Sequence, residues 1–345
     1  MKHTLFWAAV LLLAVCLSVG CAANAPTETT EDLRAALLAA AEEVTVTDTS
    51  VIFTDAVGER REIAKNSENV VSLYASFTTL WYEAGGQVIG CIGGNTARNL
   101  YKEHIGRDIT ADPTVTVAAD SASSGKWSVE RIIALRPSLI LCSVAMDGYA
   151  VIKNPAAAAG IPVIAVDYDT FEDYLKWFKV FCHLNDRADL WDSVALPVLD
   201  EVVQCIASLP GNETPQVFAM FADYNSLQAN TSGTVVGEMI SLLGGVNIAD
   251  SPYTADAERI PVNLETVYAA DPDVIVVQCH SDAASAKRIV EETYGDNAVW
   301  KELRAVREGR VYYLDKSLFH NKPNSRFGEA YRTLAEILYG SSPQP

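Results

Sequence analysis

The sequence predicts an α/β protein made of two similar lobes with mainly parallel sheets. Three observations support this prediction: short apolar strands alternate with helices, one strand–helix pattern occurs twice, and one long helical stretch separates the two copies. Strands that alternate with helices form parallel βαβ units, in which helices cover both faces of the sheet. We therefore expect lobes over residues 50–185 and 210–345, joined by a single helix over residues 186–209.

The first lobe opens with a hairpin pattern, because residues 51–63 alternate apolar and polar side chains around Gly58. The short apolar run over residues 70–74 predicts a strand. A helix is expected over residues 78–84, where two glycines follow, and a strand over residues 88–91. The second lobe begins in the same way, with a strand over 217–220 and a helix over 238–243 that two glycines again follow.

A longer unit is also repeated. Glu130 opens a helix that ends at Pro137 before an apolar strand, and Glu265 opens a helix that ends at Pro272 before another. The glutamate-to-proline spacing is seven residues in both copies. Each unit is followed by a further strand that ends in aspartate, over 161–167 and 311–315. The repeat predicts two Rossmann-like lobes with ligand binding in a cleft between them.

The stretch between the copies, residues 186–209, has leucine and valine at helical spacings. Pro197 is its only helix-breaking residue, so we expect a single long helix with a kink at that proline. A helix of this length between two repeats favours a strut that connects the lobes over an ordinary core helix.

The N-terminus is typical of a secretory signal, predicted over residues 1–20, because an apolar run follows Lys2 and is too short to span a bilayer. Cys21 follows a small residue, which resembles a bacterial lipobox, although Ser18 stands where that motif prefers leucine. We expect Cys21 to carry a lipid and residues 21–49 to form a linker to the membrane. The alternative is an ordinary cleaved signal with an incidental cysteine.

The formal net charge is −18, which argues against nucleic acid and anionic lipid as partners. Five cysteines remain after Cys21, an odd number at wide spacings and mostly in apolar runs. These features predict buried free thiols and neither a disulfide framework nor a zinc site. The histidines are scattered, so we expect no dedicated metal site and no resident cofactor.

Taken in order, the repeated glutamate–proline units, the paired glycine stops and the C-terminal run 300–312 resemble a known family. It is the periplasmic-binding-protein group that serves importers of ferric siderophores, haem and vitamin B12. The resemblance covers nearly all of residues 51–339. It implies two lobes joined by a stiff helix, a monomeric binding protein, a membrane permease with its ATPase as partner, and a lipid anchor on the outer face of the cytoplasmic membrane.

Docking in this family uses one carboxylate on each lobe, paired with permease arginines. In the second lobe Glu238 occupies the matching position, and in the first lobe Thr79 replaces the carboxylate. Glu83 lies four residues further on, on the same helical face, and is our candidate for the missing role. Both glutamates could equally belong to solvated helix surfaces.

Ligands in open α/β sheets bind beyond the carboxyl ends of the strands. That rule predicts the following ligand-binding residues: Tyr74, Ser76, Asn95, Lys126, Trp127, Met146, Tyr149, Tyr224, Arg259, His280, Lys322 and Arg326. The two last cations suit an anionic ferric complex, or they could serve helix capping and solubility. His280 could be an axial ligand of haem iron or corrinoid cobalt, with Tyr74 or Met146 opposite, or simply a hydrogen-bonded polar residue.

These observations favour the extracytoplasmic substrate-binding component of an importer, with a ferric siderophore as the leading ligand and haem or a corrinoid as alternatives. Other possibilities are a ligand-sensing lipoprotein without a permease and an α/β enzyme. The sequence contains no GxSxG, GxxxxGK[ST], GxGxxG or HExxH motif, so we expect no enzyme.

Overall fold

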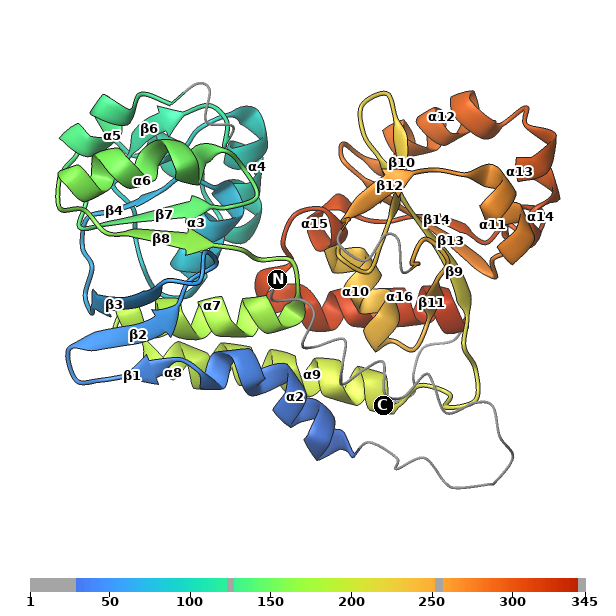
Figure 1. The fold of residues 1–345 in the computed structure, drawn as a ribbon, viewed down its shortest axis with the longest axis horizontal. Helices are drawn as coiled ribbons and strands as arrows, with labels where there is room; N and C mark the ends of the chain where they lie inside the picture. Colours follow the sequence, from blue (N-terminus) through green and yellow to red (C-terminus); the bar gives the residue numbers. More distant parts are fainter. Residues whose placement is uncertain (1–28, 123–126, 252–256, 341–345) are drawn as a thin grey trace.

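Two α/β lobes lie side by side above a layer of helices (Figure 1). The computed structural model describes residues 29–122, 127–251 and 257–340. The predicted signal peptide, Cys21 and Lys126 therefore lie outside the described residues. Within the described part of the chain, no helix combines the length and apolarity needed to span a bilayer.

The N-terminal lobe contains a five-stranded parallel sheet in the order β6-β5-β4-β7-β8. Its strands are β4 (Val70–Ser72), β5 (Gly90–Ile92), β6 (Thr116–Ala119), β7 (Leu139–Ser143) and β8 (Val163–Val166). Its helices are α3 (Ala75–Glu83), α4 (Asn95–His104), η1 (Ile109–Ala111), α5 (Val129–Ala134) and α6 (Gly148–Ala158). A small antiparallel sheet of β1 (Thr45–Val46), β2 (Ser50–Thr54) and β3 (Arg60–Ala64) contains the predicted hairpin.

The C-terminal lobe contains a six-stranded mixed sheet in the order β12-β10-β9-β13-β14, with β11 also paired to β9. Its strands are β9 (Gln216–Ala222), β10 (Leu227–Asn230), β11 (Val246–Asn247), β12 (Arg259–Pro261), β13 (Val274–Cys279) and β14 (Val311–Tyr313). Its helices are α10 (Val235–Leu242), α11 (Leu264–Ala270), α12 (Ala283–Tyr294), α13 (Ala298–Glu302), α14 (Arg304–Arg307), α15 (Lys316–Phe319), η4 (Asn324–Arg326) and α16 (Phe327–Tyr339). In this sheet only the two pairings of β10, with β9 and with β12, are antiparallel, so the prediction of mainly parallel sheets is confirmed.

The sequence repeat corresponds to the same local structure in both lobes. Ser128 caps α5 and Asn263 caps α11, each accepting hydrogen bonds from free backbone N–H groups of the first turn. Gly85 and Gly244 follow α3 and α10 with φ angles of +85° and +76°. Only glycine adopts this left-handed conformation at little cost, which explains why both helices end at paired glycines.

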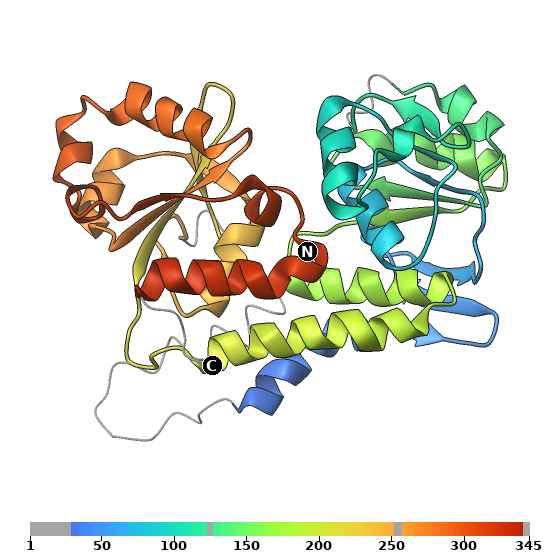
Figure 2. The ribbon, with the colours of Figure 1, turned by 180° about the vertical axis from the view of Figure 1, so that it is seen from behind.

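A layer of helices lies beneath both lobes: α2 (Thr30–Glu42), α7 (Phe171–Leu184), α8 (Ala188–Leu190), the π-helical η3 (Trp191–Ala195) and α9 (Leu196–Ala207). The view from behind shows that α8, η3 and α9 run continuously from under one lobe to under the other (Figure 2). The predicted bridging helix is therefore present. Pro197 is the second residue of α9, which directly follows η3. The π-helical hydrogen-bond pattern of η3 interrupts the α-helix just before the proline at which a kink was predicted.

The prediction of a linker over residues 21–49 is wrong from residue 30 onward. Thr29 and Asp32 form a capping box that starts α2, and this helix buries Leu37 and Ala41. The helix packs against α7 and α9, where Arg34 pairs with Asp200. The small and polar residues at the start of the segment are typical of a linker, whereas its leucines have the spacing of a helix.

The lobes meet beneath the cleft in an aromatic cluster that we call the floor, made of Tyr168, Phe171, Tyr174, Phe327 and Tyr331. All five side chains are buried. Phe327 of α16 lies 4.9 Å from Phe171 and 5.3 Å from Tyr174 of α7, measured between ring centroids. Because these rings come from both lobes, the floor ties the two lobes together independently of any ligand.

Close packing of α16 on α9 supports the floor from below. A side chain at Gly328 would lie 2.0 Å from the Glu201 carboxylate, so only glycine allows this approach. Arg332 of α16 also donates to Glu201 at 2.8 Å. The cleft therefore opens above a base in which α16 is fixed to the bridging helix.

Candidate functional site

A cleft of about 630 Å³ lies between the lobes, above the floor. The side chains of the N-terminal wall follow the ends of β4, β5, β6, β7 and β8, and α3 and α4 begin there. The C-terminal wall follows the ends of β9, β13 and β14 and includes the start of β12. The cleft thus occupies the position that the carboxyl-end rule predicts, and its volume suits a small-molecule ligand.

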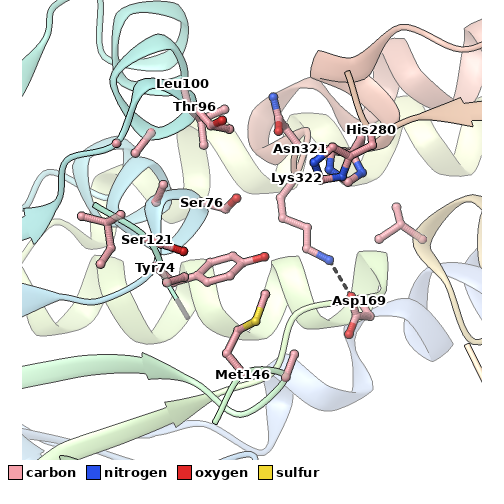
Figure 3. A pocket seen from close by; sticks show the side chains of 18 of the residues that line it. Tyr74, Ser76, Thr96, Leu100, Ser121, Met146, Asp169, His280, Asn321 and Lys322 are labelled. Carbon is pink, nitrogen blue, oxygen red and sulfur yellow. Dashed lines mark hydrogen bonds and ion pairs between the residues drawn. The ribbon is translucent and has the colours of Figure 1, made fainter. Parts of the chain in front are cut away.

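Seven of the twelve predicted ligand-binding residues line this cleft: Tyr74, Ser76, Asn95, Met146, Arg259, His280 and Lys322. Figure 3 shows Tyr74, Ser76 and Met146 reaching in from one side and His280 and Lys322 from the other. Tyr74 and Arg259 are 185 residues apart in the sequence and line the same cleft only because the lobes face each other.

Four predicted ligand-binding residues that the structure describes do not line the cleft: Trp127, Tyr149, Tyr224 and Arg326. The Trp127 ring packs against Gly148 and its Nε1 donates to the Ser121 carbonyl, so it supports the wall from behind. The Tyr149 hydroxyl accepts a hydrogen bond from Arg61 at 3.2 Å, on the side of the β2–β3 hairpin. Both residues follow strand ends but turn into the lobe, and their contact with a ligand stays a prediction.

Arg326 is the third. Its guanidinium binds Glu329 at 2.8 Å and reaches Glu103 of the other lobe at 3.4 Å, away from the cleft lining. Arg326 thus contributes to the start of α16 and to a contact between the lobes, and its contact with a ligand stays a prediction. Tyr224 lies at the edge, 63% exposed, with its ring 4.5 Å from that of His280.

Several lining residues were missed by the sequence analysis. Asp169 follows β8 and His320 follows α15, and both face the cleft together with Asp120, Phe221 and Gln278. The carboxyl-end rule could have found Asp169, since it lies three residues beyond its strand. His320 had no comparable signal, because only the fold of residues 316–322 brings it beside His280.

The C-terminal wall carries an aromatic and imidazole group. The rings of His280 and His320 lie 4.8 Å apart, and Phe221 contacts both. Arg259 stacks over Phe221 at 4.3 Å, and its Nε donates to the Asn230 side chain. Burial, together with the nearby charge of His280, lowers the pKa of His320 to about 3, and burial also lowers the pKa of His280. Both imidazoles are therefore neutral at neutral pH.

Lys322 crosses the bottom of the cleft to the other lobe. Its ammonium binds Asp169 at 2.6 Å and lies 5.3 Å from the Tyr168 ring. Burial alone would lower the pKa of Lys322, but the charge of Asp169 outweighs it and the pKa is raised. The Lys322–Asp169 pair thus links the lobes where the floor meets the walls.

Asn324 makes a second polar link beside this pair. It accepts from the Tyr168 hydroxyl and donates to Thr79, both at 3.1 Å, and it is fully buried with φ of +53°. Thr79, the residue that replaces the expected carboxylate of the first lobe, is therefore part of the contact between the lobes.

The two candidate docking carboxylates are half-buried. Glu83 lies 3.5 Å from the buried ring of His104. Glu238 accepts from the Tyr331 hydroxyl at 3.2 Å, next to the start of α7. Burial, together with the charge of Glu172, raises the pKa of Glu238 to about 8. Neither carboxylate projects into solvent as an arginine-binding group on a docking surface would.

The free cysteines agree with the sequence analysis. Cys91, Cys142, Cys182, Cys205 and Cys279 are all buried and unpaired. Burial raises the pKa of each thiol, to about 11 for Cys279, which lies directly before His280. These thiols are packed as small apolar groups and do not contribute donors to the cleft.

A two-lobed α/β fold with a ligand-sized cleft at the strand ends of both sheets defines a protein that encloses a small molecule between its lobes. The sequence matches the periplasmic binding protein family over residues 70–318, and the chain belongs to that family. The resemblance noted in the sequence is thereby confirmed, and the family is one of binding proteins and not of enzymes.

Individual relatives are distant. The chain is 23% identical over 333 residues to the "Putative ABC transporter substrate-binding lipoprotein YhfQ" of Bacillus subtilis, covering 92% of each chain. It is 25% identical over 259 residues to the Fe(3+)-citrate-binding protein YfmC of the same organism, covering 74% of this chain and 75% of YfmC. The structure of IsdE from Staphylococcus aureus complexed with heme superposes with a TM-score of 0.62 at 19% identity, covering 79% of this chain and all of IsdE.

Proposed function

We propose that this protein is the extracytoplasmic substrate-binding component of an ABC importer, which captures an iron complex and delivers it to the permease. A ferric siderophore is the leading ligand. The observation that carries the proposal is the cleft, in which two neutral imidazoles and an arginine face a wall of hydroxyl, amide and thioether groups. The relation to YfmC, whose name specifies ferric citrate, supports the same ligand class.

The charges in the cleft refine this ligand class. The described lining residues include two cations, Arg259 and Lys322, and three carboxylates, Asp120, Asp169 and Glu258. Lys322 is already paired with Asp169, so only Arg259 offers positive charge, with Glu258 3.6 Å away. Neither of the two cations expected to meet an anionic ligand offers free charge in the cleft, because Arg326 lies outside its lining and Lys322 is paired with Asp169. A cleft with this balance favours a complex of low net charge, such as a ferric hydroxamate, over a highly anionic catecholate.

Direct titration tests the proposal. The purified protein is titrated with ferric citrate, a ferric hydroxamate, hemin and cyanocobalamin, with tryptophan fluorescence and visible absorbance as readouts. We expect micromolar or tighter binding of at least one ferric chelate. No binding of any ferric chelate would overturn the iron-complex assignment.

Haem or a corrinoid is the second candidate, because donors face each other across the cleft. Met146 and Tyr74 reach in from one lobe and His280 from the other, which could supply two axial ligands to a bound macrocycle (Figure 3). A Soret band after addition of hemin, lost in His280→Ala, would support this alternative. Binding of hemin without a change in that variant would exclude His280 as the ligand.

We also propose that Cys21 carries a lipid that holds the protein on the outer face of the cytoplasmic membrane. The first described helix, α2, begins nine residues after Cys21 and lies beneath the lobes (Figure 1). Radiolabelled palmitate incorporated into the wild type and absent from Cys21→Ala tests the anchor. Docking by Glu83 and Glu238 stays a prediction, and their half-buried positions argue against it.

A further inference from the structure

Two imidazoles lie side by side on the C-terminal wall of the cleft. His280 follows β13 and His320 follows α15, so forty residues of chain separate them. Their ring centroids lie 4.8 Å apart with an angle of 60° between the ring planes. Both residues line the cleft.

Both imidazoles keep a lone pair available. The His320 ring contacts Phe221 and His280 but makes no hydrogen bond to any residue in the described part of the chain. The Nδ1 atom of His280 lies 3.8 Å from the Asp223 carboxylate, at the range of an ion pair and beyond a hydrogen bond.

The spacing of the rings matches two adjacent ligands of one metal ion. With metal–nitrogen bonds of about 2.1 Å, two imidazoles at right angles around an ion place their ring centroids about 4.5 Å apart. The observed centroid distance of 4.8 Å is close to this value. The Asp223 carboxylate lies 3.8 Å from His280 Nδ1, so a small movement would let it accept a hydrogen bond from that nitrogen while Nε2 binds the metal.

The rest of a coordination sphere is missing from the protein. Residues 29–122, 127–251 and 257–340 contain no group of three or more His, Cys, Asp or Glu side chains that could hold a metal ion. A bare ion would therefore have only two protein ligands. A ligand that brings its own metal, with four positions already filled, would supply what the protein lacks.

We propose that His280 and His320 together complete the coordination of a chelated metal ion that has two adjacent open positions. This proposal builds on the proposed function and narrows its ligand class to ferric complexes of tetradentate chelators. On binding, two water molecules leave the iron and two iron–nitrogen bonds form, with no change of oxidation state. Ferric complexes of hexadentate chelators have no open position, so they cannot form these two iron–nitrogen bonds.

The test compares two ferric complexes with the same donor groups: a tetradentate dihydroxamate and a hexadentate trihydroxamate. Each is titrated into the full-length mature protein, with tryptophan quenching and the charge-transfer band of the complex as readouts. We expect the tetradentate complex to bind at least tenfold more tightly and its band to shift on binding. His280→Ala and His320→Ala should each remove the shift and weaken that complex about tenfold, while the hexadentate complex is unaffected.

His183→Ala on α7, outside the cleft lining, is the matched control and should behave as the wild type. Equal affinities for the two complexes, unchanged in both cleft variants, would overturn the proposal for the histidine pair and leave the proposed function intact. Thermal unfolding of each variant separates loss of binding from loss of folding.

A second probe examines the pair without iron. Copper(II) iminodiacetate has open positions for imidazole, and electron paramagnetic resonance counts the nitrogens bound to copper. We expect two imidazole nitrogens in the wild type and one in each single variant. If copper binds two imidazole nitrogens in the wild type but neither ferric complex binds, the histidine pair is supported as a metal ligand and the proposed iron-complex function is overturned. Fewer than two imidazole nitrogens in the wild type would overturn the pair.

Discussion

The floor beneath the cleft and the walls above it are built from different residues. The floor consists of five buried aromatic rings from α7, α16 and the segment before α7, with ring centroids 4.9 to 6.4 Å apart in its closest pairs. The walls are polar and partly open, and they face each other across about 630 Å³. The lobes are therefore held together by contacts that need no ligand, and recognition is left to residues that contribute little to that contact.

This separation predicts how substitutions behave. Changes in the floor should alter stability and only indirectly ligand binding, whereas changes in the walls should do the reverse. The Lys322–Asp169 pair lies at the boundary, because it joins the lobes and also lines the cleft. The four predictions below test the comparison, from the largest expected effect to the smallest.

Phe327→Ala should destabilise the protein most, by about 4 kcal/mol, because it removes the ring at the centre of the floor and leaves a cavity. Urea denaturation followed by fluorescence measures the change. Met146→Ala, a wall residue that is 39% exposed, should change stability by less than about 0.5 kcal/mol. Similar losses of stability in Phe327→Ala and Met146→Ala would show that the floor and the walls contribute equally to stability.

Lys322→Met should cost about 3 kcal/mol, because Asp169 would remain in the protein without its partner. The double variant Lys322→Met/Asp169→Asn should recover most of that loss, since no unpaired charge is left. Urea denaturation of Lys322→Met, Asp169→Asn and the double variant gives the coupling free energy between the two side chains. Additive losses would mean that the two residues do not act as a pair.

Stability should fall as the pH rises toward about 8. The pKa of Glu238 is raised from its usual 4.5 to about 8, first by burial and then by the charge of Glu172, whose own pKa burial raises to about 7. The folded state therefore holds these protons more tightly than the unfolded chain does. Their stabilising contribution is complete below about pH 4 and is lost as the pH passes the folded pKa values, by at most about 1.4 kcal/mol per pH unit for each proton.

Denaturation midpoints at pH 5, 6, 7 and 8 check this dependence. Glu238→Gln should flatten the curve, because an amide mimics the protonated acid, whereas Glu265→Gln on the exposed surface of α11 should leave it unchanged. Other groups near Glu238 include Asp173 and the Tyr331 hydroxyl, so some slope should remain in the variant. An unchanged slope in Glu238→Gln would assign the effect to those groups.

Arg259→Ala should weaken binding of a ferric chelate about tenfold with little change in stability, because the guanidinium and its stack on Phe221 face the cleft. Arg326→Ala is the matched control, since Arg326 lies outside the cleft lining and binds Glu329 and Glu103. Titration calorimetry measures both. Equal losses of ligand affinity in Arg259→Ala and Arg326→Ala would contradict the placement of the binding site in the cleft.

Much of the fold could be predicted from the sequence, because its signals are local. Apolar strand cores, N-caps such as Ser128 and Asn263, and glycine stops such as Gly85 act within a few residues, and they recur in both lobes. The helix α2 was missed because its polar start resembles a linker, although the spacing of its leucines is helical.

The cleft could be predicted only in part. Strand ends are local features, so Tyr74, Ser76 and His280 were found from the carboxyl-end rule. The rule does not say which way a side chain turns after the strand, which is why Trp127 and Tyr149 were placed in the cleft and in fact pack inside their lobe.

The sequence by itself determined the two α/β lobes, the bridging helix, the free cysteines and the strand ends that carry the site, since each depends on short-range patterns. Tertiary structure alone decided that Asp169 neutralises Lys322, that His320 lies beside His280, and that Glu238 lies against the floor and not on a free surface. Those pairings join residues 40 to 153 positions apart in the chain. Their charge and burial depend on how the lobes face each other, which no local pattern encodes.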